Sequence, residues 1–110
     1  MKQPTPYLLN ILNSIESIVS YIPETELEFM EDNMCQDAIL MRLQDIGENL
    51  SKLRDMFPEF WENNAIDSWI KAIGLRNIIS HGYAEVNIST IWSLVSKDLK
   101  PFKDSIQSNI

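Results

Sequence analysis

The sequence predicts an all-α protein built as an antiparallel bundle of four or five helices. Apolar residues recur at steps of three and four over long stretches, which is the spacing of one helix face. Glycine is scarce, with three in 110 residues, and β-favouring residues do not alternate as they do in strands. The connections between the periodic stretches are short, which favours antiparallel neighbours. At this length, with 45% hydrophobic residues, residues 1–110 are expected to form one domain.

The first predicted helix runs from Thr5 to Tyr21. Pro23 ends it, because proline cannot continue a helix interior. Thr25 and Glu28 then have the spacing of a capping box that opens a short turn. The expected buried face of the helix consists of Leu8, Ile11, Leu12, Ile15, Val19 and Ile22.

A long second helix is predicted from Asp32 to Met56, closed by Pro58, with a loop over residues 59–65. Its apolar stripe consists of Cys35, Ile39, Leu43, Ile46, Leu50, Leu53 and Phe57. We expect the methionines near its start to fill the core, and the three tryptophans to be core or dimer-contact residues. These residues are Met30, Met34, Met41, Trp61, Trp69 and Trp92.

A third helix is predicted from Asp67, as its N-cap, to Ser80 or His81, and Gly82 ends it. Asn87 is expected to cap a fourth helix. The apolar residues of that helix are Ile88, Trp92, Val95, Leu99, Phe102 and Ile106. Pro101 lies inside the pattern, so a kink or break is expected near Lys100.

The net charge of −7 is concentrated in the first half of the chain. Residues 1–50 hold nine acids against Lys2 and Arg42, whereas residues 51–110 hold seven of each sign. Non-specific nucleic-acid binders usually carry the opposite sign, so tight and general binding is disfavoured. The acidic run at residues 24–32 is expected to be a solvated face, with a basic partner surface as the alternative.

Cysteine content and the pattern at the N-terminus indicate a cytoplasmic protein. The one cysteine, Cys35, cannot form an internal disulfide and is expected to be a small core residue. We see neither a signal peptide nor an apolar stretch of about 20 residues that would span a bilayer.

The third helix differs from the others because polar residues interrupt its apolar pattern. Ile66, Ile70 and Ile73 form a stripe whose next positions are Asn77 and His81. A second polar row contains Arg76, Ser80 and Tyr83, while Ala72, Leu75, Ile78 and Ile79 keep the other side apolar. Such a helix is expected to be packed on two sides, with polar groups that need partners.

The segment from Gly74 to Tyr83 resembles the Arg-x-x-x-x-His-x-Tyr signature of HEPN domains in the HepT-like family. Similar residues flank the signature: Trp69, the segment from Asp37-Ala38 to Ile46-Gly47-Glu48, and Ile91-Trp92. The resemblance covers about residues 25–106. It implies a HEPN-like helical fold and a homodimer, or a higher oligomer, whose paired third helices bring two motifs together.

The resemblance also implies an activity, that of a type II toxin which cuts RNA without metal through the substrate's own 2′-hydroxyl. Arg76 would hold the phosphate, His81 would act as general acid or base, and Asn77 would support them. One histidine and one cysteine are too few for a convincing metal site, and no cofactor is implied. Tyr83 would accept adenylate from a cognate nucleotidyltransferase antitoxin, which silences the toxin.

Helix geometry gives separate support for a dimer. A separation of five residues places Arg76 and His81 about 140° apart, so a second chain could close the gap between them. Gly74, which costs up to about 1 kcal/mol in a helix, would be tolerable if it allowed close backbone approach.

Ordinary interpretations stay open for each motif residue. Arg76 could form an ion pair with Glu48 or Glu85, His81 could be a surface residue, and Tyr83 could cover the bundle end. The whole domain could instead be a non-catalytic module that binds a nucleotidyltransferase. Whether the RNA target is tRNA or mRNA is undecided.

Overall fold

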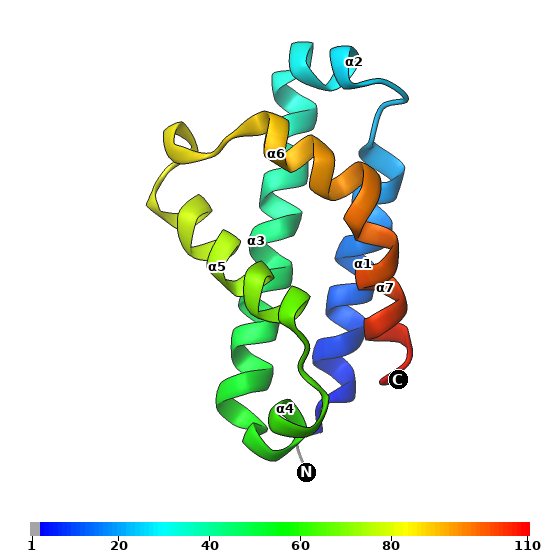
Figure 1. Cartoon of the computed structure of the whole chain (residues 1–110), viewed down its shortest axis with the longest axis vertical. Coiled ribbons are helices and arrows are strands. Elements are labelled where there is room, and N and C mark those ends of the chain that lie inside the picture. The colour runs from blue at the N-terminus through cyan, green and yellow to red at the C-terminus, as the bar shows by residue number, and fades with distance from the viewer. Residues whose placement is uncertain (1–2) are drawn as a thin grey trace.

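The computed structural model describes residues 3–110, apart from the side chain of Tyr83. Within these residues the chain is helical and contains no strand, which confirms the predicted all-α class (Figure 1). The elements in order are α1 (Thr5–Tyr21), α2 (Glu26–Glu31), α3 (Asn33–Met56), α4 (Pro58–Asn64), α5 (Asp67–His81), the 3₁₀ turn η1 (Tyr83–Glu85), α6 (Ile88–Ser93), the π-helical segment η2 (Leu94–Asp98) and α7 (Leu99–Gln107).

Helix α3 is the central element of the bundle. It packs against α1 on one flank and against α5 on the other, and α7 lies beside α1 (Figure 1). The short helices α2 and α6 meet at one end of the molecule, while α4 packs against α3 at the other end. Helix α5 crosses α3 obliquely, so its C-terminal end projects away from the axis of the bundle (Figure 1).

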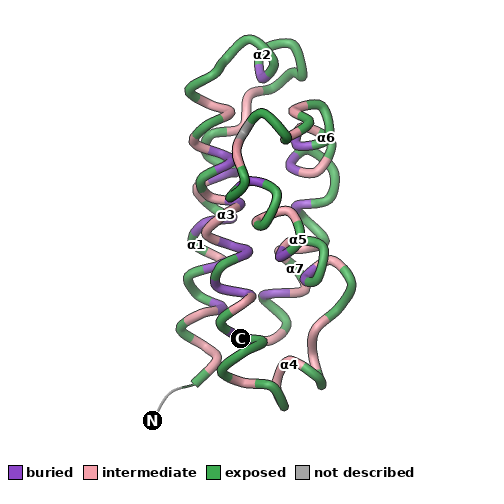
Figure 2. Tube along the Cα trace, turned by 90° about the vertical axis from the view of Figure 1, so that its left-hand side faces the viewer, coloured by how far each residue is buried: buried purple, intermediate pink, exposed green. Residues whose placement is uncertain are grey.

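The core runs along the bundle between the helices, where buried positions face inward (Figure 2). Trp69 is its largest fully buried side chain, and its indole Nε1 donates to Ser105 Oγ at 2.9 Å. Trp61 packs against Trp69 with ring centroids 5.8 Å apart, and Trp92 packs against Phe29 at 5.5 Å. Of the three tryptophans, predicted as core or dimer-contact residues, Trp69 is thus a core residue, and Trp61 and Trp92 are half-buried and pack against the core. No helix within residues 3–110 has both the length and the apolar character that crossing a membrane requires.

Capping side chains fix three helix starts, and two of these caps, Thr25 and Asn87, were predicted. Thr25 caps α2: its Oγ1 accepts from the Glu28 N–H at 3.2 Å, and its hydroxyl donates to Glu28 Oε1 at 3.2 Å, in place of the bond from the Thr25 N–H that a full capping box has. Asp32 Oδ1 accepts from the Cys35 N–H and so caps α3. Asn87 caps α6 in the same way, through the Thr90 N–H. Each cap satisfies a backbone donor that the first helical turn leaves open.

Two predictions about helix boundaries were wrong. The segment expected to be a loop, residues 59–65, mostly forms α4, because Pro58 takes the first helical position, where its missing N–H costs nothing. Asp67 is not the N-cap of α5 but its first residue; Ile66 holds the cap position without a side-chain hydrogen bond. The Asp67 carboxylate instead pairs with Lys71 at 3.0 Å.

Several expected core positions are exposed. Met34 is 84% exposed, Met41 is 55% exposed and Met30 is 43% exposed, so these methionines do not fill the core. On α1 it is Ile18 that is buried, whereas Val19 is 55% exposed. An apolar residue type therefore did not decide which of two neighbouring positions faces inward.

The irregularity expected near Lys100 lies one turn earlier. Residues Leu94–Asp98 form a π-helical segment, and Pro101 falls in the first turn of α7. In a regular α-helix the ring of Pro101 would clash with the carbonyl of Lys97, four residues before it. The wider turn of η2 relieves this clash and lets the apolar face continue to the buried residues Leu99 and Ile106.

Candidate active site

Helix α5 carries the motif and is apolar on two sides, of which the bundle covers one. Trp69, Ile73 and Ile79 are buried against the core. Ile66, Ile70 and Ile78 are 47%, 57% and 45% exposed. An apolar face of this kind on a core helix marks a surface suited to contact with another molecule.

Arg76 lies where α5 packs tightly against α3, at Gly47. Its Cβ packs directly against the backbone of Gly47. Its Nη1 donates to Asn77 Oδ1 at 3.2 Å, whereas its Nε is buried and has no hydrogen-bond partner among the described residues. An unpaired buried donor is costly unless water or a ligand completes it, and Arg42 Nε on α3 is a second such atom.

The ion pair proposed as an alternative role for Arg76 does not form. Glu48 lies 3.9 Å from Lys52 Nζ across one turn of α3. Neither Glu48 nor Glu85 pairs with Arg76 among the ion pairs of residues 3–110. The Arg76 guanidinium therefore carries a positive charge that these carboxylates leave unneutralised.

His81 is the last residue of α5, and its side chain is exposed. Gly82 follows it with a φ of +133°, a region that glycine adopts without the strain a side chain would cause. The preceding residue, Ser80, accepts a hydrogen bond from Gln44 Nε2 of α3 at 3.2 Å, which attaches the last turn to the bundle.

The motif residues are therefore close in sequence but not joined within one chain. In the part that the structure describes, the side chain of Arg76 bonds to Asn77, while His81 makes no side-chain hydrogen bond. Asn77 is exposed. The backbone of Tyr83 begins the 3₁₀ turn η1, and its side chain lies outside the described part.

A groove beside α5 is a feature that the sequence did not reveal. It has a volume of about 400 Å³ and lies between α3, α5 and the region around η2 and α7. Leu43, Leu75 and Leu99 are among its mostly apolar walls, and the buried Ser68 Oγ, which has no hydrogen-bond partner in the described chain, also belongs to a lining residue. No sequence pattern could have shown it, because its walls come from separate helices.

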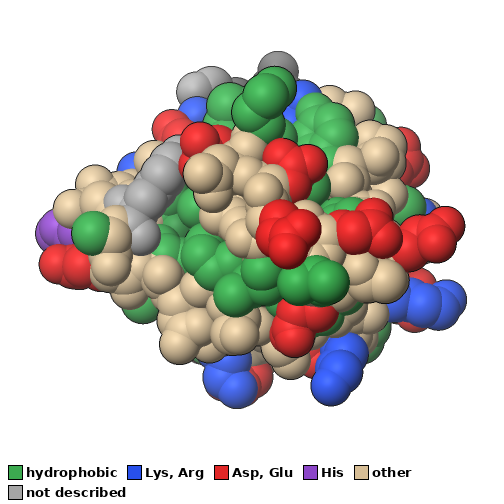
Figure 3. All heavy atoms as spheres, turned by 90° about the horizontal axis from the view of Figure 1, so that it is seen from above, with side chains coloured by type: hydrophobic (Ala, Val, Ile, Leu, Met, Phe, Trp, Pro, Cys, Tyr) green, Lys and Arg blue, Asp and Glu red, His purple; other side chains and the backbone are tan. Residues whose placement is uncertain are grey.

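The charge of the molecule restricts where a polyanion can approach. Residues 24–41 hold six acids and no Lys or Arg, and all six acids are exposed. Seen from the α2 end, acidic side chains lie among hydrophobic ones over the middle of the face, and basic ones lie mainly towards the margins (Figure 3). The acidic run at residues 24–32 is thus a solvated face, as expected, and it repels RNA.

Potential metal ligands are dispersed over the surface. Across residues 3–110 no group of three or more His, Cys, Asp or Glu side chains gathers closely enough to hold a metal ion. Cys35 is half-buried, and its Sγ donates to the Tyr21 carbonyl at 3.3 Å. Burial, followed by the nearby Asp32 carboxylate, raises the pKa of this thiol.

Comparison with known proteins identifies the family. Residues 11–108 match the model of the ribonuclease HepT-like family. A Methanocaldococcus jannaschii protein, named "gamma-glutamylcyclotransferase and putative RNase", is 33% identical over 101 residues, which are 91% of this chain and 44% of that protein. The chain thus spans less than half of that relative's length.

Two further relatives are similar over most of their own length. A Caldanaerobacter subterraneus protein named "putative RNase" is 29% identical over 108 residues, covering 97% of this chain and 94% of the relative. The "mRNA nuclease HepT" of Shewanella oneidensis is 29% identical over 100 residues, covering 72% and 75% respectively. No solved structure matches the chain. The extent of the family match shows that this chain belongs to the HepT-like ribonucleases of the HEPN family.

Proposed function

We propose that this protein is an endoribonuclease toxin that cuts RNA without a metal ion, with Arg76 and His81 as catalytic residues. The observation that carries the proposal is the end of α5, where a guanidinium with an unpartnered Nε precedes an exposed imidazole by five residues. A family of ribonucleases supplies the reaction class.

Arg76 binds the scissile phosphate in this proposal. Its buried Nε and the adjacent terminal nitrogen have the fork geometry that matches two phosphate oxygens. Asn77 supports the guanidinium by accepting from its other terminal nitrogen. As negative charge grows on the phosphate oxygens in the transition state, this fixed cation stabilises it.

His81 transfers the protons. One imidazole accepts the proton of the 2′-hydroxyl while that oxygen forms a bond to phosphorus. The bond from phosphorus to the 5′-oxygen breaks with its electron pair, and this oxygen takes a proton from a second, protonated imidazole. The products are a 2′,3′-cyclic phosphate and a 5′-hydroxyl. Histidine suits both roles because its charge changes near neutral pH.

The second imidazole comes from a second copy of the chain, so the proposed active form is a homodimer. The exposed side of α5, with Ile66, Ile70 and Ile78, offers the apolar surface that such pairing would bury. The neighbouring groove could receive side chains of the other copy. Arg76 and His81 of one chain lie far apart around the helix, and pairing would bring the Arg76 of one copy near the His81 of the other.

Tyr83 is the proposed point of control. A nucleotidyltransferase antitoxin in the same cytoplasm would transfer adenylate to its hydroxyl, two residues beyond His81. The added phosphate would occupy the space of the substrate phosphate and repel it. The supporting facts are the position of Tyr83 next to Gly82 and the name of the relative HepT.

A second candidate function is a non-catalytic module that binds a nucleotidyltransferase. The exposed acidic face of residues 24–41 favours it, because that face suits a basic protein surface better than RNA. A scaffold of this kind would not need Arg76 or His81. Loss of toxicity in His81→Ala, with the oligomeric state intact, would exclude it as the whole function.

The deciding experiment incubates purified protein with total cellular RNA in EDTA, beside an Arg76→Ala/His81→Ala variant. Discrete fragments that end in cyclic phosphate, absent with the variant, are the expected result. Intact RNA, from protein whose mass shows unmodified Tyr83, would overturn the proposal in favour of the binding module. A mass increase of one adenylate on Tyr83 would show that the silenced form had been assayed.

A further inference from the structure

Gly47 occupies an unusual position, in the middle of the 24-residue helix α3. A glycine inside a helix destabilises it by up to about 1 kcal/mol relative to alanine. Here the position is buried, and a Cβ added to it would overlap the Arg76 Cβ and stand 2.9 Å from the Ala72 carbonyl oxygen. Because Gly47 has no side chain, α5 can pack into the space that a Cβ would fill.

A second contact fixes the same pair of helices one turn away. Gln44 lies one turn before Gly47 on the same face of α3, and it donates to Ser80 Oγ at 3.2 Å. Ser80 lies one turn after Arg76 on α5. The segment that carries Arg76 is thus held to α3 by one hydrogen bond and by one direct backbone contact.

We propose that Gly47 is a positioning residue that sets the distance between α3 and α5 and thereby fixes the direction of the Arg76 guanidinium. The effect of Gly47 on catalysis rests on the proposed function, since Gly47 acts on the residue that would bind phosphate. Its effect on the position of the Arg76 side chain does not depend on that function. Gly47 touches no substrate and acts only through Arg76.

The contrast with Gly74 supports a specific role. Gly74 lies on α5, one turn before Ile78, and a Cβ added there would meet nothing within 4 Å in the chain. The two helical glycines therefore differ: Gly74 is open to solvent, whereas atoms of α5 occupy the space beside Gly47. A methyl group at Gly47 would push Arg76 outward, and a displacement of about 1 Å can reduce a rate up to about 10²-fold.

The kinetic test compares Gly47→Ala with Ile15→Val, a core change that lowers stability and lies on α1, a helix that does not pack substantially against α5. At a temperature where both variants are folded, kcat is expected to fall by about ten- to a hundredfold in Gly47→Ala and to stay within about twofold in Ile15→Val. An unchanged kcat in Gly47→Ala, or equal losses in both variants, would overturn the proposal.

A spectroscopic test needs no activity, so it separates this proposal from the proposed function. The Nε–H signals of the three arginines are assigned in ¹⁵N-labelled protein with Arg42→Lys, Arg54→Lys and Arg76→Lys variants. In Gly47→Ala the Arg76 Nε–H signal is expected to shift and to exchange faster with water, while that of the exposed Arg54 stays in place. An unmoved Arg76 signal would overturn the positioning role even if the wild-type protein cuts RNA. If the Arg76 signal shifts but the wild-type protein cuts no RNA, the positioning role of Gly47 is supported and the proposed function is wrong.

Discussion

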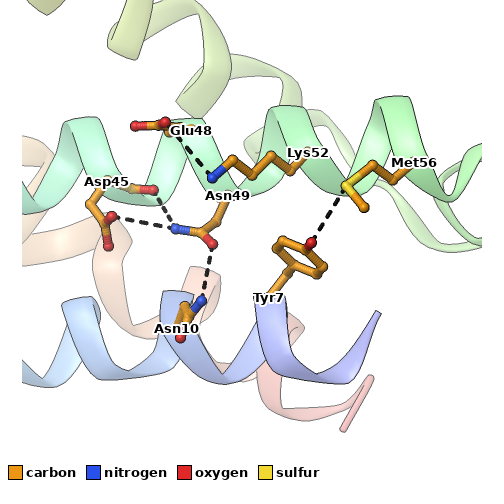
Figure 4. A network of polar contacts seen from close by, with 7 residues as sticks. All are labelled: Tyr7, Asn10, Asp45, Glu48, Asn49, Lys52 and Met56. Carbon is orange, nitrogen blue, oxygen red and sulfur yellow. Dashed lines mark hydrogen bonds and ion pairs between the residues drawn. The ribbon is translucent and has the colours of Figure 1, made fainter. Parts of the chain in front are cut away.

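The two flanks of α3 are held by different kinds of contact. On the α1 flank the polar side chains are joined: Ser14 donates to Asp45 at 2.6 Å, and Asn10 donates to Asn49 at 3.3 Å. Figure 4 shows part of this network, with Asn49 also bonded to Asp45. On the α5 flank the described residues provide one side-chain hydrogen bond, from Gln44, and leave a buried guanidinium nitrogen open.

Under the proposed function, this difference separates a stabilising interface from the one that carries the candidate site. Polar groups that satisfy one another, as Asp45 and Asn49 do, contribute to stability and have little capacity left for a ligand. A donor that stays unpartnered lowers stability but is ready to bind. Loss of a partner on the α1 flank should therefore lower mainly stability, whereas changes on the α5 flank should lower mainly the rate of cleavage.

The largest expected effect is on the α5 flank, from His81→Ala. RNA cleavage should fall by a factor of about 10²–10⁴, the usual contribution of a general acid or base. The midpoint of thermal unfolding should barely move, because the side chain is exposed and makes no described hydrogen bond. Gel-based cleavage assays and circular dichroism on the same sample measure both. Full activity in His81→Ala would contradict the assignment of the candidate site to the α5 flank.

A smaller loss is expected from Ile70→Asp, on the exposed side of α5. Burying an isoleucine contributes about 1.5–3 kcal/mol, and a charge in its place adds a penalty, so the affinity of the proposed homodimer should fall at least tenfold. Sedimentation measures the dimer, while helix content should stay unchanged. Met34→Asp, at a more exposed site on α3, is the matched control and should leave the dimer intact. Equal behaviour of the two variants would place the dimer contact elsewhere.

On the α1 flank Ser14→Ala should cost about 1–3 kcal/mol, because Asp45 loses a partner in a partly buried site. For about 100 residues this corresponds to a fall in Tm of very roughly 4–8 °C per kcal/mol. The rate of cleavage per folded molecule should not change. A variant that kept its Tm but lost activity would reverse the roles assigned to the two flanks.

The smallest effect concerns Cys35, which also faces the α1 flank through its bond to the Tyr21 carbonyl. Burial, assisted by Asp32, raises the pKa of its thiol, so less thiolate is present at pH 8 than in an ordinary cysteine. Alkylation by iodoacetamide should therefore be slow at pH 8 and should increase towards higher pH. In Asp32→Asn the reaction should become faster at a given pH. A rate like that of a free thiol at pH 8 would contradict the shift.

The long helices were predictable because each combines strong periodicity with unambiguous ends. Helix α1 has the predicted bounds and ends at Tyr21, two residues before Pro23, and α5 ends as predicted at His81, before Gly82. Asn87 and Thr25 were recognisable caps because their side chains act within three residues. Local physical chemistry decides these features.

The remaining features depend on contacts between distant segments. Met34 lies on the solvent side of α3, because the helices that pack on α3, among them α1, α2 and α5, lie against its other sides. The open Nε of Arg76 could not be read from spacing, since it results from which acids fail to reach it. Gly47 did carry a signal, as a glycine inside a long apolar stripe, but its meaning depends on the position of α5. The sequence therefore predicted which residues form the motif, but it did not predict which contacts those residues make.

The π-helical segment η2 also has a consequence for changes in chain length. A π-turn holds about one residue more than an α-turn, so the helix here accommodates one residue more than a regular α-helix would. Removing one residue there, such as Ser96, would leave the orientation of α7 almost unchanged, whereas the same deletion in α3 would rotate everything after it by about 100°. Pro101 opposes that shortening, because a regular helix would bring its ring against the carbonyl four residues earlier. Relatives that lack this extra residue are therefore expected to lack a proline here as well.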